Sequence, residues 1–273
     1  MHHTLVAIIT FSLIFSNSCA QWVPQGPPLQ CTGSFGPFYQ GEATAFSPDG
    51  STVATSYRSQ FINGLATGVF IFRKTGGQWV QQILLPESSK VVNMALSSNG
   101  NTLVVHFDND TINIYQYGNN TWSLQSTFLP PIVHFQFSSS HRQVAISYSG
   151  NVMVVGPEVY VRYGASWQLQ SNLRPYDRPV TYQSFCDSAN QFGCNYSSSS
   201  ISADGKTVVI GDEYDPDNNT NAWVFINDGT GWRQQGPRLE GTNNSNAALQ
   251  NYAAQVVGSG DGKTIAMSAG NNL

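Results

Sequence analysis

Short runs of alternating apolar and polar residues fill most of the chain beyond residue 40, and turn-forming residues separate them. Five of these turns share one form, in which a Ser is followed three residues later by a Gly. They lie at residues 47–50, 97–100, 147–150, 202–205 and 259–262. Their glycines are 50, 50, 55 and 57 residues apart, and a regular spacing of this size is typical of a repeat protein. The sequence therefore predicts five successive copies of one structural unit.

Each shared turn predicts a β-hairpin. Apolar runs precede and follow it, and the residue two positions after the glycine is Thr in four copies and Val152 in the other. A short Asp-Gly or Asn-Gly turn between two such runs is typical of a hairpin in which the glycine adopts a positive φ. The Ser hydroxyl can bond the turn backbone. We therefore interpret these serines as turn residues and not as catalytic nucleophiles.

Two further strands are predicted after each hairpin. The third run is apolar and aromatic, and a glycine turn then leads to a Trp with a Gln three residues later. The Trp and Gln pairs are Trp79 and Gln82, Trp122 and Gln125, Trp167 and Gln170, and Trp232 and Gln235, and Trp22 and Gln25 fit the same pattern before the first hairpin. Four antiparallel strands per repeat, A to D, with no helical pattern between them, are typical of the blades of a β-propeller.

The predicted fold class is therefore an all-β propeller over residues 21–273. We expect blades at about 41–85, 91–128, 143–170, 198–236 and 252–273, the last one partial, with 22–28 as a stray outer strand that closes the ring. Apolar residues of strands B and C and the strand-D Trp should form the core between blades. The last repeat stops after its second strand, which indicates either a fragment of a larger ring or a five-bladed ring with an incomplete final blade. An unpaired edge promotes aggregation, which favours the fragment.

The best copy of the repeat runs from Asp204-Gly205-Lys206-Thr207 to Trp232-Arg233-Gln234-Gln235-Gly236, with an acidic loop between its second and third strands. This pattern resembles the FG-GAP-type repeats of secreted propellers, which are distantly similar to the integrin α-chain head; TolB-like and WD40 propellers use similar turns. The resemblance implies a seven-bladed ring in the integrin case and Ca²⁺ bound in the B–C loop. Asp215, Asp217 and Asn219 match the first three ligand positions of such a loop, but no Gly or acid follows at the later ones. A calcium site and a solvated acidic turn both remain open.

The first 20 residues predict a secretory signal peptide. The apolar run from Leu5 to Phe15 is too short to span a bilayer, and small residues stand near its end, as cleavage requires. No later stretch is long enough to cross a membrane. Charged residues make up 10% of the chain, and its 12 basic residues are scattered, so we expect no nucleic-acid binding. These features favour a secreted, extracellular protein.

Cysteines and glycosylation sequons fit that location. Cys186 and Cys194 lie in one polar loop and are expected to form a disulfide bond, which leaves Cys31 as the odd cysteine. Cys19 is lost with the signal, unless the signal is of the bacterial lipoprotein type and Cys19 is acylated. Five Asn-x-Ser/Thr sequons, at Asn109, Asn119, Asn195, Asn218 and Asn243, predict glycosylation if the source is a eukaryote.

The longer connections all lie at one end of the predicted blades, the end of the B–C and D–A connections. Long loops held by a rigid scaffold usually carry binding. We expect a ligand face centred on the fourth repeat, with Tyr176, Tyr182, Asp212, Glu213 and Tyr214 as candidates. Two functions remain: a non-catalytic binding or adhesion module for a protein or carbohydrate, and a secreted hydrolase or lyase. Acid/base hydrolysis needs two converging carboxylates, and the acids of this chain share no recurrent spacing, which favours binding over catalysis.

Overall fold

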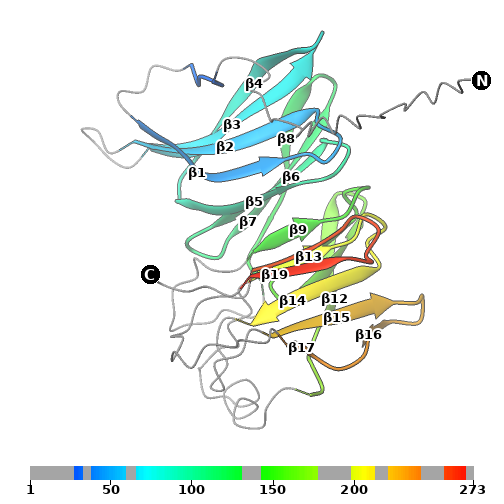
Figure 1. The fold of residues 1–273 in the computed structure, drawn as a ribbon. Helices are drawn as coiled ribbons and strands as arrows, with labels where there is room; N and C mark the ends of the chain where they lie inside the picture. Colours follow the sequence, from blue (N-terminus) through cyan, green and yellow to red (C-terminus); the bar gives the residue numbers. More distant parts are fainter. Residues whose placement is uncertain are drawn as a thin grey trace, which may run out of the picture. The chain divides into compact units, whose positions relative to one another are not determined.

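The computed structural model describes residues 28–32, 38–59, 66–130, 143–177, 198–212, 221–240 and 255–268. The chain divides into two compact units, Met1–Gln30 and Cys31–Leu273, and all the described strands belong to the second unit. Every regular element in the described ranges is a β-strand (Figure 1). These ranges hold no helix long and apolar enough to cross a membrane. The predicted signal peptide and nearly all of the predicted opening strand lie outside the described residues.

The strands form antiparallel sheets in which neighbours in sequence are neighbours in space (Figure 1). We call these sheets blades 1 to 5 and their strands A to D in chain order. Blade 1 contains β1 (Phe38–Phe46), β2 (Thr52–Ser59), β3 (Ala66–Thr75) and β4 (Gln78–Glu87). Blade 2 contains β5 (Val91–Leu96), β6 (Thr102–Phe107), β7 (Ile112–Gly118) and β8 (Thr121–Phe128).

The later blades follow the same order with two differences. Blade 3 contains β9 (Val144–Ile146), β10 (Val152–Val155), β11 (Glu158–Tyr163) and β12 (Ser166–Asn172). Blade 4 contains β13 (Ser198–Ile201), β14 (Thr207–Asp212), β15 (Asn221–Asn227) and β16 (Trp232–Gln234), with β17 (Leu239–Glu240) as an additional short strand on β15. The described part of blade 5 consists of β18 (Gln255–Gly258) and β19 (Ile265–Ser268). The all-β prediction of four-stranded antiparallel units is confirmed.

The recurrent Ser is a turn residue in all five A–B turns, as predicted. Its Oγ accepts a hydrogen bond from the backbone N–H five residues later at 2.9 to 3.1 Å. In four turns the same hydroxyl donates to the Asp or Asn side chain two residues on, at 2.5 to 2.7 Å. The turn glycines have φ between 64° and 74°, a region that favours glycine. Each turn is therefore closed by its own side chains.

The same turns join one blade to the next. A Cβ added to Gly100 would lie 2.5 Å from Oγ1 of Thr52 in the preceding blade, and one added to Gly150 would lie 2.5 Å from Oγ1 of Thr102. Backbone hydrogen bonds also link successive turns, from Asp49 N to Ser98 O, from Tyr148 N to Ala203 O and from Ala203 N to Gly260 O. The recurrent Thr or Val after each glycine is thus the surface on which the next turn packs.

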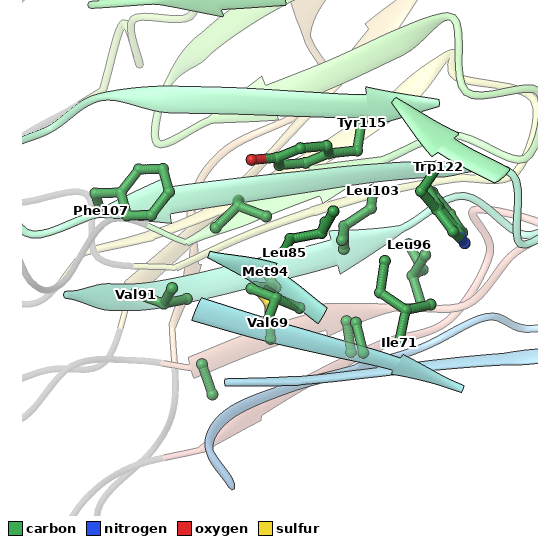
Figure 2. Close-up of a cluster of buried hydrophobic side chains, with 14 residues drawn as sticks. Val69, Ile71, Leu85, Val91, Met94, Leu96, Leu103, Phe107, Tyr115 and Trp122 are labelled. Carbon is green, nitrogen blue, oxygen red and sulfur yellow. The ribbon is translucent and has the colours of Figure 1, made fainter. Parts of the chain in front are cut away.

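Apolar clusters fill the junctions between successive blades. In the first junction, Val69, Ile71 and Leu85 of blade 1 pack with residues of blade 2 that include Leu103 and Trp122 (Figure 2). Equivalent clusters hold residues of blades 2 and 3, of blades 3 and 4, and of blades 4 and 5. Trp122 is 4% exposed, and Trp167 and Trp232 pack against the next two clusters. Strand-B, strand-C and Trp side chains take part in these clusters as predicted, and strand A adds side chains such as Met94 and Leu96 that the prediction left out.

In blades 1 to 3 the Gln of the Trp-x-x-Gln motif occupies a β-bulge in strand D, a role that the sequence did not indicate. In blade 2, Ile114 pairs with Ser126 and Tyr115 with Leu124, so Gln125 is the extra residue between them. Gln82 and Gln170 hold the same place in blades 1 and 3. A bulge twists the strand and re-aims the extra side chain. Strand D is the outer strand of its sheet, where a bulge also discourages pairing with other chains.

Candidate functional site

Strand D of blade 4 departs from the repeat. In blades 1 to 3 the D strands β4, β8 and β12 are continuous, but in blade 4 the strand is divided into β16 and β17. β15 pairs first with β16 and then with β17, and residues 235–238 lie between them. Gly236 in this interruption has a φ of 74°, and Pro237 follows it. Functional sites often lie where a regular structure is interrupted, so we look for a binding site at this segment.

Asp177, from the connection after blade 3, is bound at this interruption. Its Oδ1 accepts hydrogen bonds from Trp223 Nε1 at 3.0 Å and from Gln234 Nε2 at 2.9 Å. Its Oδ2 accepts one from the backbone N–H of Arg238 at 2.6 Å. Burial by itself would raise the pKa of Asp177, but these hydrogen bonds outweigh it and lower the pKa. Asp177 is therefore an ionised structural anchor that ties the connection to strands C and D of blade 4.

Tyr176, which precedes Asp177, is hydrogen-bonded through both its backbone and its hydroxyl group, and yet it is exposed. Its backbone N–H donates to Gln234 Oε1 at 3.0 Å, and its hydroxyl donates to the carbonyl oxygen of Gly236 at 3.0 Å. Gln234 Nε2 also donates to Gly236 O, which fixes the segment that receives the tyrosine. Tyr176 is 66% exposed, more than any other large apolar side chain in the described ranges. The result is an immobilised aromatic ring that faces solvent.

Arg238 adds a polar group to the same segment. Its Nε donates to the carboxylate of Glu240. Its Nη1 is buried and has no hydrogen-bond acceptor among the residues that the structure describes. A buried donor that lacks an acceptor is unfavourable by about 1–3 kcal/mol. Because Nη1 is enclosed by the protein, it is not available to a ligand at the surface.

The junctions of the earlier blades use their carboxylates differently. Glu87, at the end of β4, accepts hydrogen bonds from the Tyr115 hydroxyl and, at 3.1 Å, from Asn113 Nδ2 in blade 2. Burial raises the pKa of Glu87, and these hydrogen bonds lower it by less. Glu158 is buried and accepts a hydrogen bond from the Tyr160 hydroxyl at 2.6 Å. Both carboxylates accept from aromatic hydroxyls of strand C, but Glu87 links blade 1 to blade 2, whereas the Glu158 bond lies within β11 of blade 3.

One further polar pair lies in the interior of blade 2. His106 Nε2 lies 3.3 Å from Asp110 Oδ1, and both side chains are buried. Within the described ranges there is no group of three or more His, Cys, Asp or Glu residues placed to hold a metal ion.

The structure describes two of the five predicted ligand-face residues. Tyr176 lies in the cluster just described, and Asp212 ends β14, where it pairs with Asn221 at the start of β15. Asp177, Gln234 and Arg238 were missed because their partners lie 46 to 61 residues away in the sequence. The Gly-Pro dipeptide at 236–237, which breaks the fourth strand D, was the available signal.

The other predicted site residues divide into two groups. Those outside the described residues, which stay predictions, are Tyr182, Glu213, Tyr214, the proposed calcium ligands Asp215, Asp217 and Asn219, the cysteines Cys186 and Cys194, and the sequon residues Asn195, Asn218 and Asn243. Asn109 and Asn119 are exposed in the turns that follow β6 and β7, and Asn119 has a φ of 51°. Cys31 is free and partly buried, and burial raises the pKa of its thiol to about 11.

The sequence matches no known protein family and no curated protein. In contrast, the structure is similar to the crystal structure of a propeller-like protein from Lactobacillus plantarum, with a TM-score of 0.54. The two chains are 12% identical, and the similarity covers 84% of this chain and 63% of the other. The chain has a β-propeller fold. The predicted fold class is thereby confirmed, and at this identity the similarity shows the fold alone.

Proposed function

We propose that this chain is an extracellular, non-catalytic β-propeller that binds a protein or a carbohydrate at the end that carries the B–C and D–A connections. The observation that carries the proposal is Tyr176, which is immobilised by two hydrogen bonds and is 66% exposed. A fixed aromatic ring offers a large contact area and loses little conformational entropy on binding. Such a ring at a surface is typical of a binding site.

The other end of the blades supports this choice of face. Its A–B turns are closed by their own Ser and Asp or Asn side chains and are joined to one another by backbone hydrogen bonds. The polar groups of these turns are therefore largely engaged within the protein. The connection that carries Tyr176 and Asp177 lies at the opposite end of blade 3, because antiparallel strands place successive connections at alternate ends.

The resemblance to FG-GAP-type repeats supports the extracellular location, together with the signal-like first 20 residues and the sequons. In this proposal Cys186 and Cys194 form a disulfide bond. Calcium bound by Asp215, Asp217 and Asn219 would stiffen the loop of blade 4 close to the proposed face. The hydrolase or lyase alternative requires two carboxylates that converge on a bound substrate. The buried carboxylate Glu158 and the partly buried carboxylates Glu87 and Asp177 are instead engaged by aromatic hydroxyl or indole donors.

The experiment compares two tyrosines of blade 3 that lie at opposite ends. Tyr176 follows β12, whereas Tyr163 lies at the C–D turn and is 56% exposed. The purified full chain and its variants Tyr176→Ala and Tyr163→Ala are applied to an array of glycans and to an array of extracellular protein domains. We expect saturable binding to at least one probe, weakened about tenfold or more by Tyr176→Ala and unchanged by Tyr163→Ala. Binding to no probe, or equal loss in both variants, would contradict the proposal.

A further inference from the structure

We infer that Asn99, in the A–B turn of blade 2, is a deamidation site, at which asparagine converts to aspartate or isoaspartate at a rate that contacts from blade 1 control. The residue before the turn glycine is Asp in three of the five A–B turns and Ser149 in one, and only in blade 2 is it Asn. Gly100 favours the reaction, because it has no Cβ to obstruct attack by its backbone nitrogen. The site lies at the end of the blades opposite the proposed ligand face, so modification and binding can be measured separately.

The reaction uses groups of the turn and one water molecule. The backbone nitrogen of Gly100 attacks Cγ of Asn99, and the bond from Cγ to Nδ2 breaks. The proton of the Gly100 N–H goes with the leaving group, which departs as ammonia and leaves a cyclic imide. Water then opens the imide at one of its two carbonyl carbons, and the product is aspartate or isoaspartate. Asn99 is partly exposed, so water can reach the imide.

The closed turn holds both reacting groups apart from each other. The Gly100 N–H donates to the carbonyl oxygen of Ser97 at 2.8 Å. Oδ1 of Asn99 accepts from Ser97 Oγ at 2.7 Å and from the backbone N–H of Asn101 at 3.1 Å. The attack requires the carboxamide to turn towards the Gly100 nitrogen, which breaks these bonds. The folded chain therefore reacts through the small fraction of molecules in which the turn is open.

Blade 1 supplies contacts that keep this turn closed. The carbonyl oxygen of Gly100 accepts from Thr52 Oγ1 and from Arg73 Nη1, both at 3.3 Å. Arg73 Nη1 also donates to Asn101 Oδ1 at 3.0 Å, so one guanidinium group holds two neighbouring residues of the turn. Loss of these contacts should increase the open fraction, and the rate of deamidation should rise in proportion.

The two products should differ in their fit to the turn. Asp204 and Asp261 occupy the corresponding place in blades 4 and 5, where each accepts from the turn Ser hydroxyl at 2.6 and 2.5 Å. This hydrogen bond is the main cause that lowers the pKa of both carboxyl groups, so the turn favours a carboxylate. Isoaspartate instead adds a methylene group to the backbone before Gly100, which is buried against Thr52. Aspartate should therefore be accommodated, and isoaspartate should disturb the junction between blades 1 and 2.

The test is peptide mass spectrometry of the full chain during incubation at mildly alkaline pH, with fragmentation that distinguishes aspartate from isoaspartate. We expect the folded wild type to react at Asn99 about tenfold or more slowly than the same chain in guanidinium chloride. In buffer, Arg73→Ala should react about threefold or more faster than the folded wild type. Thr52→Val should also react faster, and Val152 in the same place of blade 3 shows that the side chain fits. Arg233→Ala, which removes an exposed arginine of blade 4, is the control and should not change the rate.

Thermal unfolding of each variant shows whether it is folded, and Thr52→Val provides the readout if Arg73→Ala fails to fold. Asn99→Asp should be at least as stable as the wild type. No product at Asn99 in the denatured chain would overturn the site itself. Equal rates in the folded and denatured wild type would show that the turn does not control the reaction. Unchanged rates in folded Arg73→Ala and Thr52→Val would overturn the role of blade 1.

Discussion

Trp232 Nε1 in blade 4 donates a hydrogen bond to Gln170 Oε1 in blade 3, at 3.0 Å. Gln170 is the bulge residue of its strand, so the bulge directs this side chain towards the following blade. The Trp of one Trp-x-x-Gln motif thus donates to the Gln of the motif in the preceding blade, across the junction between the two blades.

This relationship predicts a second bond of the same kind. Trp167 Nε1 and Gln125 Oε1 hold the corresponding places in blades 3 and 2, and both are buried without a hydrogen-bond partner in the described ranges. We expect them to bond in solution, directly or through one water, because a complementary buried donor and acceptor are otherwise left unsatisfied. Gln125→Leu and Gln170→Leu should each lower the free energy of unfolding by about 0.5–1.5 kcal/mol. Urea titration measures this, with exposed Gln168→Leu as the control; no loss in Gln125→Leu would exclude the second bond.

The turn glycines provide a matched test of blade packing. Gly100 and Gly164 have almost the same φ, 64° and 63°, but a Cβ on Gly100 would lie 2.5 Å from Thr52 Oγ1, whereas one on Gly164 would meet nothing within 4 Å. Gly164→Ala should lower the free energy of unfolding by about 1–2 kcal/mol for backbone strain alone. Gly100→Ala should lower it by a further 1–3 kcal/mol or so, because of the clash with the preceding blade. Equal losses in urea titration would argue against close packing of the turns.

Strand D of blade 2 offers a test of the core between blades. Trp122 is 4% exposed, and Leu124 in the same strand is 53% exposed. We expect Trp122→Ala to lower the free energy of unfolding by about 3–5 kcal/mol, because it leaves a cavity between blades 1 and 2. Leu124→Ala should change it by less than about 1 kcal/mol. Thermal unfolding of both variants checks this. A large loss of stability in Leu124→Ala would contradict the prediction, because it would show that Leu124 makes a contact outside the junction between blades 1 and 2.

Two carboxylates are expected to respond to pH in opposite directions. The pKa of Glu87 is raised from 4.5 by burial, so its contribution to stability is present at low pH and is lost as the pH rises through the folded-state pKa. The pKa of Asp177 is lowered from 3.8, because its hydrogen bonds outweigh burial, so its contribution is present above about pH 4 and is lost as the pH falls.

The measurement is the free energy of unfolding against pH for the wild type, Glu87→Gln and Asp177→Asn. The difference between the wild type and Asp177→Asn should shrink as the pH falls below about 4. Relative to Glu87→Gln, the wild type should lose stability as the pH rises above about 4.5. Parallel curves for either variant would show that the carboxyl group in question is not coupled to folding.

The sequence predicted the repeating parts of the fold well. The hydrogen bonds of the Ser and Gly in each turn span five residues or fewer, and a Trp recurs at a fixed place in strand D of blades 1 to 4. The bulged Gln was not predicted, because it depends on the register between strands C and D, which the spacing does not reveal. Asp177 was missed for a related reason, since its partners belong to another blade. The proposed site thus lies in the part of blade 4 that departs from the repeat. No other copy of the repeat contains an equivalent segment that could have indicated it.

The central claim is that ligand binds at the end of the blades that carries Tyr176. Amide hydrogen exchange of the full chain, with and without the probe that binds it on the arrays, tests this most directly. The account predicts slower exchange on binding in residues 174–177 and 232–240, and unchanged exchange in the turns at 147–150 and 163–166. Slower exchange confined to those turns would contradict it.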